Sequence, residues 1–147
     1  MSFTQTAGQG VAMAVQQLAN QVGLQVTVQN PDYVQCGIGL PNGRKQLVHL
    51  MTAGNFGDQT VVQVWTPVVQ MPAGGLPANV ANGLLQENAT FKIGGFGIRQ
   101  VQGAALLMFY QNVVLESLSP QALMTTIGVV GSTGDQWEQK LGNSDMF

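Results

Sequence analysis

The segment LSPQALMTTIGVVGSTGDQWEQKL, residues 118–141, carries the strongest structural signal in this 147-residue sequence. Ser119 can cap a helix that begins at Pro120, because proline lacks the N–H that the first helical turn leaves unpaired. Leu118 before the cap and Leu123 after it can form a hydrophobic staple. One face of the segment is apolar or small at helical spacing, namely at Leu123, Ile127, Val130, Gly134, Trp137 and Leu141. The segment therefore predicts a long helix with one face buried against a core.

Two further glycines in this segment bear on how the helix packs. Gly128 and Gly131 each weaken a helix by about 1 kcal/mol relative to alanine, but they can also allow it to approach a sheet closely. Beyond the last apolar residue, the tail over residues 142–147 is expected to fray.

The residues before this helix are typical of β-strands. Residues 104–115 are apolar at both parities, which predicts a strand covered on two faces. Upstream, residues 91–93 and 96–98 place their apolar side chains at opposite parities, with Gly94 and Gly95 between them. We expect one strand there, with a bulge at the two glycines that rotates its faces.

Two more helices are expected nearer the N-terminus. The first covers about residues 6–22, because apolar residues recur at helical spacing, with Thr4 or Thr6 as its cap and Gly23 as its stop; those residues are Val11, Val15, Leu18 and Val22. The second begins at Pro77, carries Val80, Leu84 and Leu85, and ends near Glu87.

Between these two helices the apolar period is two. Alternation over residues 26–40 predicts a half-buried strand, interrupted near Asn30-Pro31-Asp32 by a bend or an edge, because Pro31 cannot donate a ladder hydrogen bond. A turn over residues 40–44 leads to a strand over 45–52, and a turn over 54–58 leads to one over 60–69.

The predicted order is therefore helix, three strands, helix, two strands, helix. This order indicates an α+β protein with a mainly antiparallel sheet packed by its terminal helices. A chain of this length, with no long linker and no internal repeat, is expected to form one domain over residues 1–147.

Charged residues make up 8% of the sequence, against about 25% in a typical soluble domain. The surface must then be largely neutral, and neutral surfaces resist self-association poorly. This favours an oligomer or a stable partner, although an unusual route to solubility explains it equally well. The five basic residues are scattered, which argues against nucleic-acid binding.

The location expected from the sequence is the cytoplasm. The N-terminus has no basic leader, and no window approaches 18 uninterrupted apolar residues, so neither a signal peptide nor a membrane span is expected. The single cysteine, Cys36, cannot form an intrachain disulfide.

Cys36 and the single histidine, His49, could act as nucleophile and base only if their side chains meet. A three-residue loop after Leu40 pairs Cys36 with Val48 and turns His49 to the opposite face, whereas a two-residue loop places Cys36 across from His49. Pro41 favours the first register, because the second needs the N–H that proline lacks. We therefore expect no catalytic residues.

The acidic residues give no clearer site. Asp135 and Glu138 lie one helical turn apart, and we expect both on a solvated face near the end of the chain. With one histidine, one cysteine and no tight acidic cluster, we expect neither a metal nor another cofactor.

Trp65 is the most informative aromatic residue, since it shares a strand face with Val61 and Gln63. It can be a core tryptophan covered by a helix, which is the commoner case, or a hot spot for a partner. The residues expected to contact a partner are Val61, Gln63, Trp65, Val80 and Leu84.

Three segments carry a resemblance to a known family: residues 84–94, which read LLQENATFKIG; the strand over residues 106–115; and residues 118–123, which read LSPQAL. Together they resemble the YbjN-like family, whose fold is that of type III secretion chaperones. In that family a helix ending in Leu-Leu-x-x-x-Asn leads into a glycine-containing strand, and a long helix follows a Leu-Ser-Pro step.

The resemblance is detailed over roughly the last 70 residues and extends to the order of elements over nearly the whole chain. It implies a bacterial, cytoplasmic homodimer that binds an extended segment of another protein, without catalytic residues. The main hypothesis is thus a non-enzymatic, chaperone-like or regulatory binding module. The alternative is a small-molecule sensor with a pocket between the last helix and the sheet.

Overall fold

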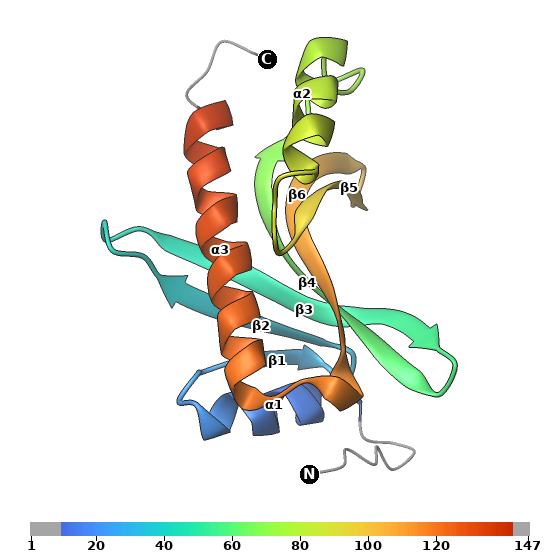
Figure 1. Ribbon diagram of the computed structural model, residues 1–147, viewed down its shortest axis with the longest axis vertical. Coiled ribbons are helices and arrows are strands. Elements are labelled where there is room, and N and C mark those ends of the chain that lie inside the picture. Colours follow the sequence, from blue (N-terminus) through green and yellow to red (C-terminus); the bar gives the residue numbers. More distant parts are fainter. Residues whose placement is uncertain (1–9, 143–147) are drawn as a thin grey trace.

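A computed structural model describes residues 10–142, and Figure 1 shows their arrangement. The elements in chain order are α1 (Val11–Gln21), β1 (Thr27–Asn30), β2 (Tyr33–Gly39), β3 (Lys45–Phe56), β4 (Gln59–Gln70), α2 (Ala78–Asn88), β5 (Gly95–Val101), β6 (Ala104–Val114), the 3-10 turn η1 (Leu115–Ser117) and α3 (Pro120–Gly142). The predicted α+β class is confirmed. Between residues 10 and 142, none of the helices combines the length and the apolar character needed to cross a membrane.

The strands form one antiparallel sheet in the order β1-β2-β3-β4-β6-β5. The expectation of one interrupted strand over residues 26–40 is wrong, because the chain reverses at Pro31-Asp32 and forms the β1–β2 hairpin. The side chain of Asn30 closes this turn by accepting a 2.8 Å hydrogen bond from the N–H of Asp32. An Asx turn of this kind reverses the chain where Pro31 already breaks the ladder.

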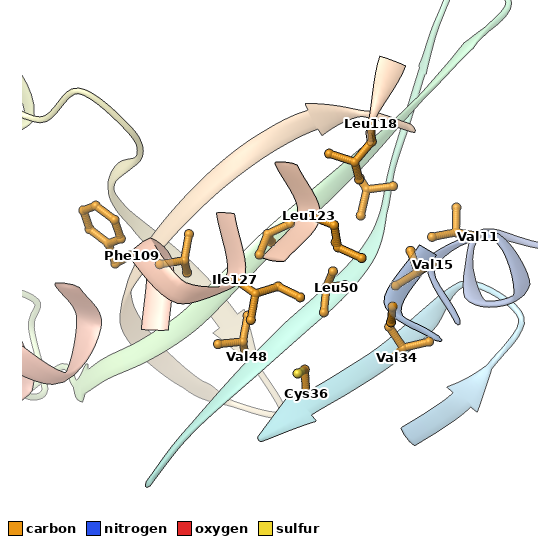
Figure 2. Packing of buried hydrophobic residues seen from close by; sticks show 14 of the residues in the cluster. Val11, Val15, Val34, Cys36, Val48, Leu50, Phe109, Leu118, Leu123 and Ile127 are labelled. Atoms are coloured by element: carbon orange, nitrogen blue, oxygen red, sulfur yellow. The ribbon is translucent and has the colours of Figure 1, made fainter. Parts of the chain in front are cut away.

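The helices cover one face of the sheet. In Figure 1, α3 crosses the strands, α1 lies at the foot of α3, and α2 lies beside the opposite end of the sheet, near β5 and β6. Figure 2 shows the core that results, with side chains of α1 and α3 meeting the inward side chains of β2, β3 and β6. We call the opposite side of the sheet the uncovered face, since no helix between residues 10 and 142 lies on it.

The expected start of α3 is confirmed. Ser119 Oγ accepts a 3.0 Å hydrogen bond from the N–H of Ala122, and Pro120 is the first helical residue. Leu118 and Leu123 are both buried, as a hydrophobic staple requires. The tail beyond residue 142 lies outside the described residues.

The start of α1 differs from the expectation. The helix begins at Val11 with Gly10 as its N-cap, so it is shorter than the predicted span over 6–22. Thr4 and Thr6, the expected caps, lie outside the described residues. Gly23 follows the helix with φ +72°, which confirms it as the left-handed stop.

The predicted strand over residues 91–93 and its bulge are wrong. β5 begins only at Gly95, and the ring of Phe91 instead packs edge-on against Phe109 at 5.0 Å. Gly94 marks the boundary because it has φ +85°, and a Cβ there would lie 2.5 Å from the Phe109 ring. Aromatic packing of the preceding loop thus replaces ladder pairing.

Candidate functional site

The first candidate surface lies between α2 and β5. A pocket of about 280 Å³ opens there, and the residues around it are almost all apolar, among them Leu76, Leu84, Leu85, Phe96, Ile98 and Leu107. Leu84 points inward and is buried, whereas Leu85, one step further around the helix, is 67% exposed. Ile98 on β5 is 56% exposed. We call Leu76, Leu85, Ile98 and the pocket between them the α2–β5 surface.

Beside this surface, β5 is an edge strand of the sheet. The N–H of Phe96 donates to Asn88 Oδ1 at 2.7 Å, and Asn88 Nδ2 donates to Phe96 O at 3.4 Å, so the peptide groups of Phe96 face away from β6. In an antiparallel ladder this orientation alternates, which turns the N–H and C=O of Ile98 and Gln100 outward as well. They are positioned to pair with another strand.

The other edge of the sheet, formed by β1, is a much poorer template for pairing with another strand. β1 has four residues, all exposed, and short edge strands are poor templates for pairing. β5 is longer, and its charged residue, Arg99, turns its side chain toward Trp65 and away from the edge. The edge of β5 therefore lacks the charges that usually protect such strands.

The second candidate site lies on the uncovered face. Strand pairing places Gln35 beside His49, His49 beside Trp65 and Trp65 beside Tyr110, all on this face. The imidazole of His49 stacks on the Trp65 ring at 4.3 Å, and the Arg99 guanidinium carbon lies 4.7 Å from the centroid of that ring. Arg99 also donates a hydrogen bond to Gln63 Oε1. We call Tyr33, His49, Gln63, Trp65 and Arg99 the Trp65 cluster.

Hydrogen bonds fix the histidine in this cluster. Gln35 Nε2 donates to the Tyr33 hydroxyl at 2.6 Å, and that hydroxyl lies 2.6 Å from His49 Nδ1. Because the hydroxyl already accepts from Gln35, its proton is available to Nδ1. Burial, followed by the positive charge of Arg99, lowers the pKa of His49 to about 4. His49 is therefore neutral at pH 7.

Two donors in the Trp65 cluster are buried without a partner. Neither Trp65 Nε1 nor Arg99 Nε forms a hydrogen bond to any described residue. Burial also lowers the pKa of Arg99. Buried donors and half-buried charges normally have partners, so the Trp65 cluster lacks acceptors for two of its donors and an opposite charge for Arg99.

Charges are distributed unequally between the two sides of the sheet. Every acidic residue between positions 10 and 142 lies in a turn or a helix, namely Asp32, Asp58, Glu87, Glu116, Asp135 and Glu138. On the helix side, Arg44 pairs with Asp135 at 2.8 Å and approaches Glu138 at 3.6 Å. Arg99 forms no ion pair with a carboxylate of residues 10–142.

One expectation about these acids is wrong. Asp135 was expected on a solvated face but is only 4% exposed. Its carboxylate binds Arg44 Nε and also accepts a 2.8 Å hydrogen bond from Gln139 Nε2. Arg44 comes from the β2–β3 turn, 91 residues away in sequence, so helical spacing alone could not reveal the pairing. Glu138 is partly exposed.

The structure does not bring Cys36 and His49 together. Cys36 pairs with Val48 and Gln35 with His49, while Leu40 N–H donates to Arg44 O, which confirms the register predicted from Pro41. Cys36 lies in the core, and burial raises the pKa of its thiol. The two side chains occupy opposite faces of the sheet and cannot act as a nucleophile–base pair.

The residues expected to contact a partner fall in two places. Val61, Gln63 and Trp65 lie along β4 on the uncovered face, and Trp65 is only 5% exposed there, beneath Arg99. Val80 and Leu84 are buried on the inner side of α2. Their contact with a partner stays a prediction, and for the buried ones it requires some displacement of their neighbours.

Sequence reasoning missed several residues that define these surfaces. Leu85 and Ile98 are apolar, and their sequence pattern does not show that they are exposed, because this depends on which side of α2 and β5 faces the core. Arg99 shares its parity with Gly95 and Gly97, which indicates the face it occupies, but its contact with Trp65 crosses an intervening strand. Among residues 10–142, no group of three or more His, Cys, Asp or Glu side chains is placed to hold a metal ion.

No protein-family model matches the chain, and no curated protein matches its sequence.

Proposed function

We propose that this protein is a non-enzymatic, homodimeric binding module of the chaperone-like kind, which holds an extended segment of another protein. The observation that supports the homodimer in this proposal is the unprotected edge of β5 beside the exposed apolar residues of the α2–β5 surface. The resemblance of residues 84–123 to the YbjN-like family supports the same function.

A second copy of this chain fits the α2–β5 surface. Two β5 strands related by a two-fold axis pair antiparallel, and each then offers the outward groups of Ile98 and Gln100 to the other. Leu85 and Ile98, which are exposed in one copy and line the apolar pocket, are the side chains available to pack against the second copy. The α2–β5 surface contains few charges that could repel a second copy, in keeping with the 8% charged residues of the chain.

This arrangement also assigns a place to the bound segment. Dimerisation through β5 covers the edge that would otherwise aggregate, and it leaves the uncovered face of the sheet accessible in each copy. An extended segment can bind there through side chains, with main-chain pairing confined to the edges.

Light scattering coupled to size-exclusion chromatography tests the dimer. The wild-type chain should elute with twice the mass of one chain. Leu85→Glu should elute as a monomer that keeps the circular-dichroism spectrum of the folded chain, because Leu85 is 67% exposed in one copy; its thermal midpoint should fall by the stability that dimerisation adds. Met13→Glu is the matched control: Met13 is 49% exposed, lies on α1, and should leave the dimer intact. A monomeric wild type, or a dimeric Leu85→Glu, would contradict the proposal.

The pocket of the α2–β5 surface favours a second candidate function, a small-molecule sensor. The pocket lies between α2 and β5 rather than under α3, and its size suits a small apolar ligand. Thermal-shift screening with apolar metabolites tests this, since a ligand bound only by the folded state raises the midpoint. Ala81→Phe, which fills the pocket, should abolish any shift.

A further inference from the structure

The guanidinium of Arg99 is half-buried on the uncovered face without an opposite charge beside it within residues 10–142. The two contacts that it makes within residues 10–142, with the Trp65 ring and with the amide of Gln63, are both to neutral groups. A charge removed from water is costly unless an opposite charge and hydrogen bonds compensate for it. The buried carboxylate of Asp135 follows this rule through its ion pair with Arg44, whereas Arg99 has no such partner within residues 10–142.

The unpartnered donors beside it indicate where an acceptor belongs. Trp65 is 95% buried, its Nε1–H has no acceptor, and the guanidinium of Arg99, whose Nε also lacks an acceptor, lies over the same ring. A carboxylate has two acceptor oxygens, enough to offer one acceptor to each of these donors. Carboxylates match the planar fork of an arginine in this way.

The surroundings select a carboxylate on a peptide over a phosphate group. Arg99 and Lys45 are the only basic residues on the uncovered face within the described chain, and phosphate-rich ligands need several clustered cations. The rest of the face is neutral, with amides at Gln35 and Gln63, and no atom lies within 4 Å of a Cβ built at Gly37. A neutral, open strand surface suits an extended chain with few charges.

We propose that the Trp65 cluster binds the carboxylate of an acidic residue in the extended segment of a partner protein, with Arg99 as its ion-pair partner and Trp65 as a further donor. This deepens the proposed function and rests on it, since the segment is the one that the binding module holds. The uncovered face supplies the positive charge and lacks any competing carboxylate within residues 10–142, so the partner supplies the negative one.

Fluorescence of Trp65 provides the test. A Trp137→Phe background leaves Trp65 as the only tryptophan, because the chain has two. The probes are the peptide acetyl-Thr-Val-Glu-Val-Thr-amide, its isostere with Gln in place of Glu, and inorganic phosphate. The acidic peptide should change Trp65 emission saturably, because its carboxylate binds beside the indole ring.

The expected preference for the acidic peptide over its Gln isostere is about tenfold, the difference that one charge-assisted hydrogen bond makes. Arg99→Gln should remove this preference, whereas Lys45→Gln, which removes a positive charge from the same face, should keep most of it. Because Arg99→Gln could also disturb the fold, the comparison of the two peptides on unchanged Arg99 decides the matter independently.

The proposal is overturned if neither peptide binds, if the Gln isostere binds as tightly, or if phosphate displaces the acidic peptide at equal concentration. Light scattering on the same samples separates this from the proposed dimer. A dimer without preference for the acidic peptide refutes only the carboxylate site, and a monomer that keeps the preference refutes only the dimer.

Discussion

Replacing Gly134 with alanine tests how closely α3 packs on the sheet. A Cβ at this position would lie 2.2 Å from Thr66 Cγ2, whereas carbon atoms in contact are about 3.5–4 Å apart. α3 and β4 would therefore have to separate by more than about 1 Å. Thr66 cannot move aside, because its hydroxyl donates to Leu47 O at 2.7 Å and accepts from Gln46 Nε2 at 2.8 Å.

The expected magnitude follows from two opposing effects. Overpacking of a tight core costs about 1–3 kcal/mol, and the rigid neighbour puts Gly134→Ala at the upper end of that range. Alanine regains about 1 kcal/mol of helix propensity, so the net loss of unfolding free energy should be about 2 kcal/mol. For a chain of this size that lowers the thermal midpoint by roughly 4–8 °C.

Gly128→Ala is the matched control in the same helix. Gly128 is exposed, and nothing lies within 4 Å of a Cβ built there. The same substitution should therefore stabilise the protein by about 1 kcal/mol. Urea unfolding followed by circular dichroism, at one fixed protein concentration, measures both variants. If Gly134→Ala were as stable as Gly128→Ala, the close packing of α3 against β4 would be refuted.

Two further predictions concern charge. The pKa of His49 is about 4 in the folded chain and about 6.5 when unfolded, so its contribution to stability is complete above pH 6.5 and is lost as the pH falls toward 4. After allowance for the partial exposure of His49, this contribution amounts to about 1–2 kcal/mol. His49→Gln should remove it from the pH dependence of the unfolding free energy. An unchanged pH dependence would contradict the lowered pKa of His49. Arg44→Ala should lower the urea midpoint, because it leaves the buried carboxylate of Asp135 without its cation, whereas Lys45→Ala, one residue along, should have little effect; equal midpoints for the two variants would show that the ion pair does not support the fold.

Local sequence signals were sufficient for the ends of several elements. Ser119 and Pro120 specify the start of α3, Gly23 stops α1, and Pro41 sets the register between β2 and β3. Each depends on the backbone chemistry of a few neighbouring residues, and such signals act before any tertiary contact forms.

At Pro31 and Phe91 the local signal is compatible with two structures. Pro31 breaks a ladder whether the chain bends or reverses, and only the pairing of β1 with β2 makes it a hairpin. Phe91 has the parity of a strand, but contact with Phe109 across the core holds it in a loop. The neighbours that decided these cases come from distant parts of the sequence.

The sequence by itself determined the α+β class, the antiparallel sheet and the buried face of α3, because apolar periodicity and capping are properties of contiguous residues. Only the tertiary structure decided that Arg44 meets Asp135, that Arg99 covers Trp65, and that β5 is left as an edge. These features depend on the order of strands in the sheet, which brings together residues far apart in the chain. The proposed dimer and the carboxylate site both depend on that order.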